Sequence, residues 1–332
     1  MMEFNIQRYY PAMADVWNQF VAKSKNGTFL FDRNYMDYHQ DRFEDCSLMF
    51  YKKNRLYALL PANIVGNTLY SHQGLTYGGV IMDEHCTGSM VCQLFADLNA
   101  YLVQMGIEKV KYKAIPSIYH VVPAEEDLYA LTVVCQAQLT SRDLSSTIVN
   151  NHHIPFPESR KSGVRKAQRN QLTITESDDL ESFWNILNTN LEDRYQTHPV
   201  HTIEELRLLK SRFPNNIVLY IVQHQDEVLG GCLLYISRQV VHVQYISANE
   251  KGKESGALDL LFDELIHHRY KDVRYFDFGK STTHTHTELN HQLLFQKEGF
   301  GGRGICYDTY EWFPRLNTDV LPKKSAIALH NK

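Results

Sequence analysis

The same order of predicted elements occurs twice along this chain. In its first occurrence, residues 48–71 alternate as three short strands, with turns at Lys53-Asn54 and Gly66-Asn67. A stretch with apolar residues at helical spacing follows at 88–106, and a strand at 107–116 ends at a proline. This series predicts a meander, a helix and a further strand.

The second occurrence has similar spacing. Residues 217–247 again predict three strands, with turns at Gln225-Asp226 and Ser237-Arg238. An amphipathic helix at 255–270 and a strand at 273–279 follow. Because internal repetition is the sequence sign of a duplicated architecture, we predict two related α/β units.

Length and helix placement support this division. The chain has 332 residues, which favours two domains over one. Helical patterns precede each meander, at 13–24 in the first unit and at 178–195 and 202–213 in the second. We predict an α/β (α+β) fold with a first unit at 1–150, a basic connecting segment at 151–174, a second unit at 175–315 and a tail at 316–332.

Composition narrows the classes of function. A net charge of −4 and a pI near 6.5 give no global attraction to nucleic acid or to anionic membranes. The start of the chain lacks the pattern of a signal peptide, and no apolar run is long enough to span a membrane. The six cysteines form no C-x-x-C pair, which indicates reduced thiols rather than disulfides or a zinc site. We therefore expect a cytoplasmic protein without membrane insertion and without a metal.

Three motifs, in this order, resemble one family. They are the basic segment "SRKSGVRKAQRNQLTI" at 159–174, "YFDFG" at 275–279 and "FQKEGFGG" at 295–302. Together they resemble the FemAB-like branch of the GNAT acyltransferase superfamily. The resemblance implies two tandem GNAT-like units, each a mixed, mainly antiparallel sheet flanked by helices, with a cleft between them. It also implies a bacterial enzyme that transfers an acyl group to an amine in that cleft.

The donor and the acceptor remain open at this stage. We expect acyl-CoA, with acetyl-CoA as the first choice, and an amine of a small molecule or a cell-envelope precursor as acceptor. One alternative is an aminoacyl-tRNA-dependent peptidyltransferase of the Fem type, and another is a non-catalytic binding protein that keeps the fold. Five cations between 160 and 169 suit tRNA phosphates, but they also suit a solvated helix.

Lys297 is the first candidate catalytic group. The resemblance matches it to the lysine that Fem peptidyltransferases carry at the reacting centre, followed by Gly299 and Phe300. The family's preceding phenylalanine is replaced here by Gln296, which weakens the peptidyltransferase interpretation. A fixed positive charge would stabilise the oxyanion or the leaving group of acyl transfer. The alternative is an exposed lysine at a helix end.

Asp277 and Tyr245 are the other two candidates. Asp277 lies in an apolar strand, so burial requires a partner such as an arginine, a lysine or backbone N–H groups. It is either one member of a structural pair or a base with a raised pKa. Tyr245 lies on the strand that faces the cleft in the GNAT plan and would donate a proton to the leaving group. Its alternative is a core tyrosine.

The turn after the third strand of the second meander is the candidate site for CoA. GNAT enzymes bind the CoA pyrophosphate there through backbone N–H groups at a helix N-terminus. The residues assigned to it are Lys251, Gly252, Lys253, Ser255, Gly256 and Ala257. The alternative is an ordinary glycine-containing loop with Ser255 as the N-cap. The matching turn of the first unit is acidic and is predicted to be degenerate.

Two polar segments are candidates for acceptor contact. The first supplies Arg194, Tyr195 and His201, although Thr202 and Glu205 also form a capping box that explains part of its composition. The second is the loop that contains His284 and His286, with Thr285 or Thr287 as the predicted N-cap of the helix that follows. The spacing of these histidines does not suit a metal site.

Overall fold

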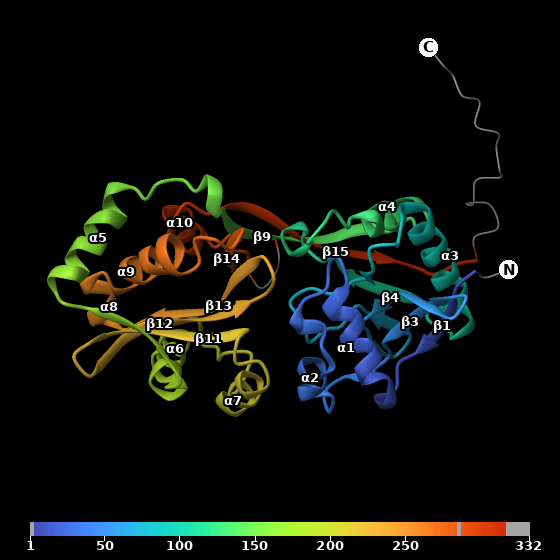
Figure 1. Cartoon of the computed structure of the whole chain (residues 1–332), viewed down its shortest axis with the longest axis horizontal. Helices are drawn as coiled ribbons and strands as arrows, with labels where there is room; N and C mark the ends of the chain where they lie inside the picture. The colour runs from blue at the N-terminus through green and yellow to red at the C-terminus, as the bar shows by residue number, and fades with distance from the viewer. Residues whose placement is uncertain (1–2, 284–286, 317–332) are drawn as a thin grey trace, which may run out of the picture.

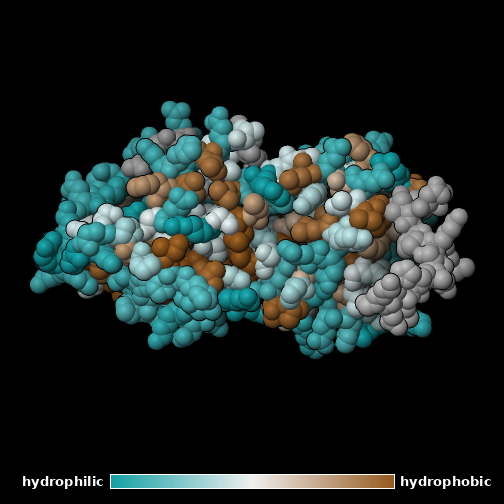
Figure 2. Space-filling view, turned by 90° about the horizontal axis from the view of Figure 1, so that it is seen from above, coloured by the Kyte–Doolittle hydropathy of each residue, from teal (hydrophilic) through white to brown (hydrophobic). Residues whose placement is uncertain are grey.

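The computed structural model describes residues 3–283 and 287–316. Two lobes lie side by side and are joined by two long antiparallel strands, β9 (Gln138–Val149) and β15 (Arg303–Trp312), which run from one lobe into the other (Figure 1). Hydrophobic side chains reach the surface around the junction of the lobes (Figure 2). The two lobes are therefore connected by hydrogen-bonded sheet.

One mixed sheet of eleven strands passes through both lobes. Its spatial order is β10 (Thr173–Ser177), β11 (Ile217–His224), β12 (Glu227–Ile236), β13 (Val240–Ala248), β14 (Tyr275–Lys280), β9, β15, β8 (Lys109–Lys113), β6 (Thr68–Tyr70), β5 (Asn63–Val65) and β2 (Glu44–Asp45). β9 and β15 stand between the strands of the two lobes. Each lobe thus completes its sheet with the same pair of strands.

Each lobe has one pair of parallel strands in this sheet. β6 runs parallel to β8, and β13 runs parallel to β14, while the other neighbours are antiparallel. Parallel strands require a crossover, which α3 (Gly88–Gln104) provides in the first lobe and α8 (Glu250–Ser255) with α9 (Ala257–Glu264) in the second. The predicted fold class, with two tandem units of mainly antiparallel sheet, is confirmed.

The first lobe also contains a separate sheet of four strands. Its order is β1 (Asn5–Arg8), β3 (Leu48–Lys52), β4 (Arg55–Leu60) and β7 (Ile81–Met82). The turns predicted at Lys53-Asn54 and at Gly66 are present, with positive φ at all three residues. Residues 48–71 form four strands instead of the predicted three, because Pro61 interrupts the pairing between β4 and β5.

The helices of the first lobe are short, apart from α3. They are α1 (Ala14–Lys23), α2 (Arg33–Met36) and α4 (Glu126–Val133). α3 and α4 pack on each other over a core that includes Phe95, Leu98 and Leu131. No helix within 3–283 and 287–316 is long and apolar enough to cross a membrane.

The helices of the second lobe cover both faces of its sheet (Figure 1). They are α5 (Glu158–Arg169), α6 (Leu180–Tyr195), α7 (Ile203–Arg212), α8, α9, a π-helical turn (Leu265–Arg269) and α10 (His291–Gly299). The single helix predicted at 255–270 is wrong in its start, because Gly256 has φ +81° and separates α8 from α9. Ser255 ends α8 and is not an N-cap; Asn249 caps α8.

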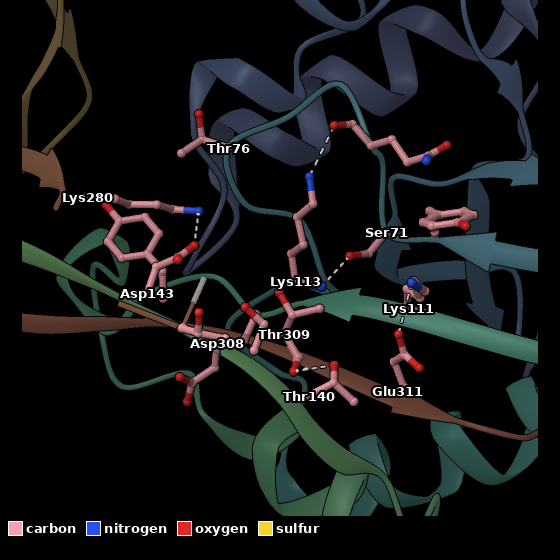
Figure 3. A pocket seen from close by; sticks show the side chains of 16 residues that line it. Ser71, Thr76, Lys111, Lys113, Thr140, Asp143, Lys280, Asp308, Thr309 and Glu311 are labelled. Carbon is pink, nitrogen blue, oxygen red and sulfur yellow. Dashed lines mark hydrogen bonds and ion pairs between the residues drawn. The ribbon is translucent and has the colours of Figure 1, made fainter. Parts of the chain in front are cut away.

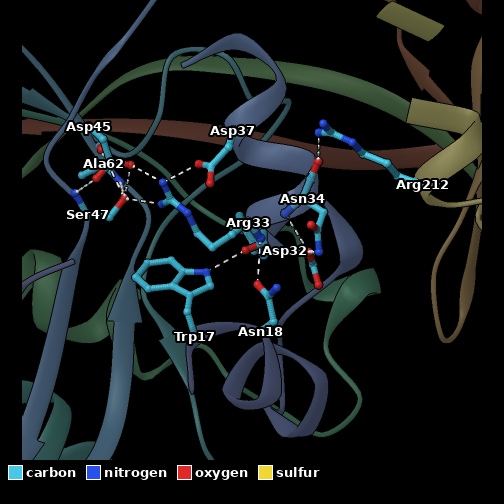
Figure 4. A network of polar contacts seen from close by, with 11 residues as sticks. Trp17, Asn18, Asp32, Arg33, Asn34, Asp37, Asp45, Ser47, Ala62 and Arg212 are labelled. Carbon is cyan, nitrogen blue, oxygen red and sulfur yellow. Dashed lines mark hydrogen bonds and ion pairs between the residues drawn. The ribbon is translucent and has the colours of Figure 1, made fainter. Parts of the chain in front are cut away.

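The core is continuous across the junction of the lobes. Tyr35 and Tyr119 of the first lobe belong to the same buried cluster as Tyr235 of the second and Tyr307 of β15. A polar network reinforces this contact (Figure 4). The buried Arg33 is held by Asp37, Asp45 and Ser47, and Arg212 of α7 donates to the carbonyl of Asn34 at 2.7 Å. The lobes therefore meet through packed side chains as well as through shared strands.

Candidate active site

Asp277, the acid predicted in an apolar strand, lies on β14 at the junction and is completely buried. Its carboxylate accepts hydrogen bonds from Ser145 Oγ at 2.5 Å, Thr147 Oγ1 at 2.7 Å and Tyr307 OH at 3.0 Å. The fourth partner is His242 Nδ1, at 2.7 Å. The predicted need for partners is met, by three hydroxyls and an imidazole instead of the arginine, lysine or backbone N–H groups named as examples.

These partners keep Asp277 ionised. Burial raises the pKa of the Asp277 carboxyl, but the hydrogen bond and the charge of His242, with the hydroxyls of Ser145 and Thr147, lower it below its ordinary value. A base with a raised pKa is therefore not supported. An ionised Asp277 accepts a hydrogen bond from Nδ1–H of His242, which leaves Nε2 of that ring as the atom able to take a proton.

His242 lies at a small pocket between the lobes. Residues from both sides line this pocket, including Phe29, Tyr77 and Tyr119 of the first lobe and Gln244 of the second. The His242 side chain is 12% exposed, so its ring is largely shielded from solvent. A histidine oriented by a buried carboxylate and open to a pocket has the arrangement of a general base.

The strands beside this histidine separate. β13 and β14 pair in parallel only from Val240–His242 opposite Tyr275–Asp277, although both strands continue beyond these residues. The pairing of β13 with β12 is shifted between Val243 and Tyr245, which marks a bulge at Gln244. The strands therefore separate beyond the His242–Asp277 pair.

Lys297 lies on α10 at the end of β14. It is 6% exposed, and its Nζ donates to the carbonyl oxygens of Gly279 at 2.8 Å and Lys280 at 2.7 Å. Burial lowers the pKa of Lys297 to about 8, and the charge of Asp277 opposes that effect. The alternative of an exposed lysine at a helix end is wrong. The ammonium fixes the end of β14 where β13 has separated from it.

Comparison with known proteins identifies a domain within the chain and structures that share its fold. A family model described as an acetyltransferase (GNAT) domain matches residues 159–286. The structure is similar to that of FemX, with a TM-score of 0.65 at 10% identity over 93% of this chain and 97% of that chain. Residues 159–286 therefore form a GNAT domain, and the whole chain has the fold of FemX.

Two further solved structures share the tandem GNAT fold. L-PGS from Bacillus licheniformis has a TM-score of 0.57 at 12% identity, over 95% of this chain and 94% of that chain. A conserved protein of unknown function from Bacteroides thetaiotaomicron VPI-5482 has a TM-score of 0.56 at 9% identity, over 95% and 100%. No curated protein matches the sequence significantly.

In the second lobe, Tyr245 and His201 form a second pair at the junction. Tyr245 OH and His201 Nδ1 are 2.7 Å apart, and the His201 ring stacks against Tyr38 of the first lobe. Burial raises the pKa of Tyr245 to about 12 and lowers the pKa of His201 to about 4. The capping box of Thr202 and Glu205 is confirmed.

The candidate CoA turn surrounds α8. Its two lysines face carboxylates: Lys251 Nζ lies 2.8 Å from Glu227 Oε1, and Lys253 Nζ lies 2.5 Å from Glu250 Oε1. The remaining assigned residues have structural contacts: Gly252 N–H donates to Asn249, Ser255 Oγ donates to the Gly252 carbonyl, and Gly256 and Ala257 join α8 to α9. The assigned residues therefore lie in α8 and at the start of α9, and the charges of both lysines are partnered.

Several predicted residues lie outside the part of the chain that the structure describes. His284 and His286 are outside the described residues, as are the side chains of Arg194 and Tyr195 at the end of α6. The N-cap predicted at Thr285 or Thr287 is wrong, because Asn290 caps α10 and accepts from Leu293 N–H. Within 3–283 and 287–316, no cluster of three or more His, Cys, Asp or Glu side chains suits a metal ion.

The residues that complete the site were not predicted. His242 is a polar residue in the apolar strand sequence "VVHVQY". The same kind of contrast identified Asp277, so this signal could have identified His242 as well. Ser145 and Thr147 alternate along β9, so they share one face of the sheet. Alternation in a strand identifies the face but not the neighbour across it. That neighbour, Asp277, comes from 130 residues further along the chain.

Proposed function

We propose that the protein is an N-acyltransferase in which His242 is the general base and Asp277 is the positioning residue that orients it. The observation that supports this function is the 2.7 Å contact of the buried Asp277 with His242, beside a pocket and at the point where β13 and β14 separate. Acyl transfer to an amine requires a base there, because an ammonium cannot attack a carbonyl carbon.

In the proposed reaction, His242 Nε2 removes one proton from the acceptor ammonium. The amine nitrogen attacks the carbonyl carbon of the donor, and the electron pair of the C=O bond moves onto oxygen. When the tetrahedral intermediate collapses, the C=O bond forms again, the C–N bond stays and the bond to the leaving group breaks. The nitrogen loses its second proton in this step, and that proton balances the one that the thiolate or alkoxide takes up. We assign the fixed positive charge near this centre to Lys297 and retain Tyr245 as the candidate proton donor.

For the donor we propose acyl-CoA, with acetyl-CoA as the first ligand to test. The glycine-containing turn at 251–257 lies directly after β13, the position of the pyrophosphate turn in the resemblance. Calorimetry with acetyl-CoA tests this proposal. Saturable binding at micromolar ligand, weakened by a Lys253→Glu variant, would support it, and no heat at millimolar ligand would overturn it.

A second donor is favoured by a specific observation. Lys161, Lys166 and Arg169 are exposed on α5, whereas both lysines of the candidate CoA turn face carboxylates. Exposed cations bind nucleic-acid phosphates, with each neutralised phosphate steepening the salt dependence. An aminoacyl-tRNA donor therefore predicts binding that weakens with salt and is lost in a K161E/K166E/R169E triple variant. Acyl-CoA binding would not respond to these substitutions.

The base is tested independently of the donor's identity. Transfer from each donor class to a panel of amines is measured for the native chain, for His242→Ala and for His224→Ala, an exposed histidine at the end of β11. We expect kcat/KM to fall by about 10²–10⁴ in the His242 variant alone. Undiminished activity of His242→Ala would exclude the mechanism.

A further inference from the structure

A polar pocket of about 560 Å³ lies beside the candidate active site, on the first-lobe side of the junction. β9 and β15 form its floor and the segment after β6 covers it, as Figure 3 shows. Six serine and threonine side chains line it: Ser71, Thr76, Thr140, Ser141, Thr287 and Thr309. Most small-molecule pockets are mainly apolar, so this lining indicates a strongly hydrophilic ligand.

The charges in the pocket balance. Three basic and three acidic side chains line it: Lys111, Lys113, Lys280, Asp143, Asp308 and Glu311. Lys280 pairs with Asp143 at 2.8 Å, and Lys111 pairs with Glu311 at 3.1 Å, at opposite ends of the pocket (Figure 3). The ammonium of Lys113 donates to three backbone carbonyls of 72–75, at 2.7–3.3 Å. An anion would have to break these pairs, so the pocket does not select for negative charge.

Paired charges and hydroxyls suit one class of ligand. Each ion pair presents a fixed donor beside a fixed acceptor, and each hydroxyl group of a sugar both donates and accepts. The rings of Tyr70 and Tyr307 also line the pocket, each beneath the ammonium of one of these lysines: Lys111 lies 5.9 Å from the Tyr70 ring centroid and Lys280 lies 5.4 Å from that of Tyr307. On the basis of the proposed function, we propose that this pocket binds the hydroxylated body of a carbohydrate acceptor, an amino sugar.

The pocket adjoins the candidate active site. Thr76 lines both this pocket and the pocket of His242. Tyr307 lines the polar pocket and donates to Asp277. On β9, Asp143 is two residues from Ser145, the next residue on the same face, which donates to Asp277. A sugar ring in the pocket would therefore place an amino substituent toward His242.

Binding is tested on the whole chain without any donor. Titrations by NMR or calorimetry compare D-glucosamine with cyclohexylamine, an amine on a six-membered ring without hydroxyl groups. We expect glucosamine to bind at least about 10-fold more tightly, because a site built for hydroxyl groups rejects an analogue that lacks them. Thr309→Val, which removes one lining hydroxyl, should weaken glucosamine by about 5- to 10-fold. Thr173→Val, at an exposed strand position on β10, is the matched control and should bind as the native chain does.

The outcomes separate this proposal from the proposed function. Equal binding of the two amines, or no effect of Thr309→Val beyond that of Thr173→Val, would overturn the carbohydrate pocket even if His242 proves to be the base. Selective binding of glucosamine, weakened by Thr309→Val, would support the carbohydrate pocket. If the same chain transferred no acyl group, the proposed function would be excluded while the pocket would stand. A β-1,4-linked trimer of glucosamine distinguishes the sources: tighter binding than the monomer indicates an envelope glycan, and weaker binding indicates a free sugar.

Discussion

Stacked imidazole rings at the junction of the lobes make the stability of the protein depend on pH. His72 of the first lobe stacks on His39, which stacks on Tyr38, and Tyr38 stacks on His201 of the second lobe. Burial lowers the pKa of His72 to about 3 and that of His201 to about 4. It also lowers the pKa of His120, elsewhere in the first lobe, to about 4.

The sign follows from comparing the folded and unfolded chains. These imidazoles titrate near 6.5 when unfolded and stay neutral in the folded protein at pH 5, so acid adds protons to the unfolded state first. Stability is complete above pH 6.5 and is lost as the pH falls towards the folded values. For each imidazole, the free energy of unfolding falls by about 1.4 kcal/mol per pH unit below 6.5. The three together lower it by roughly 6 kcal/mol at pH 5.

One buried acid opposes this loss. Burial raises the pKa of Asp127 to about 6, so its protonation stabilises the folded chain by about 1.4 kcal/mol between pH 6 and pH 5. The net loss between pH 7 and pH 5 is then about 4 kcal/mol. That is a large fraction of the roughly 5–15 kcal/mol of a folded domain.

Urea denaturation at pH 7 and pH 5, followed by fluorescence and circular dichroism, measures this loss. His72→Asn should recover about 2 kcal/mol of it, since His72 has φ +65° and asparagine tolerates that conformation. His224→Asn, at an exposed position, is the control and should recover nothing. A denaturation midpoint that does not move between the two pH values, or a His72→Asn variant with the full loss, would refute the reasoning.

Three substitutions test the site and its supports. Asp277→Asn should keep the fold by circular dichroism and lower kcat by about 10²–10⁴, because the amide no longer holds His242 in the required tautomer; an unchanged pH–rate profile would contradict this. Lys297→Met removes two charge-assisted hydrogen bonds but relieves a buried charge, so urea denaturation should show a loss of about 1–3 kcal/mol, and a more stable variant would be inconsistent with the anchoring role. Gly256→Ala should lower the free energy of unfolding, measured by urea denaturation, by about 1–3 kcal/mol more than Gly66→Ala does. Both residues have positive φ, but only at 256 would the added Cβ lie 2.4 Å from a carbonyl oxygen, that of residue 163.

The repeated order of elements was sufficient to predict two related α/β units, and the family resemblance supplied the GNAT-like arrangement of their sheets. The turns at Lys53-Asn54 and Gln225-Asp226 place the strands in register, and the helix boundaries at 88–104 and 203–212 agree with the apolar periodicity. The long β9 could not be predicted in the same way. Its partners β14 and β15 come from the last sixty residues of the chain, so its pairing depends on contacts that no local pattern encodes.

The site was predictable only where one residue conflicts with its surroundings. Asp277 among aromatic residues was such a conflict, and its need for partners is confirmed. The identity of those partners depends on which strands become neighbours, so neither His242 nor Tyr307 was selected. Lys297 was identified through the family resemblance, but its contact with the Gly279 carbonyl depends on how α10 packs against β14.

The shared strands explain why the candidate site requires both units. The segment matched as a GNAT domain, 159–286, contains His242 and Asp277 but excludes the hydroxyls of Ser145, Thr147 and Tyr307. Without these donors, the buried carboxylate would lose its hydrogen bonds to water and regain only a few from the protein. Burial would then raise its pKa and disfavour the charged form. Because β9 leads out of the first lobe and β15 returns to it, the ionisation of Asp277 depends on the strands that hold the two lobes together. The junction is thus part of the proposed chemistry of the second unit.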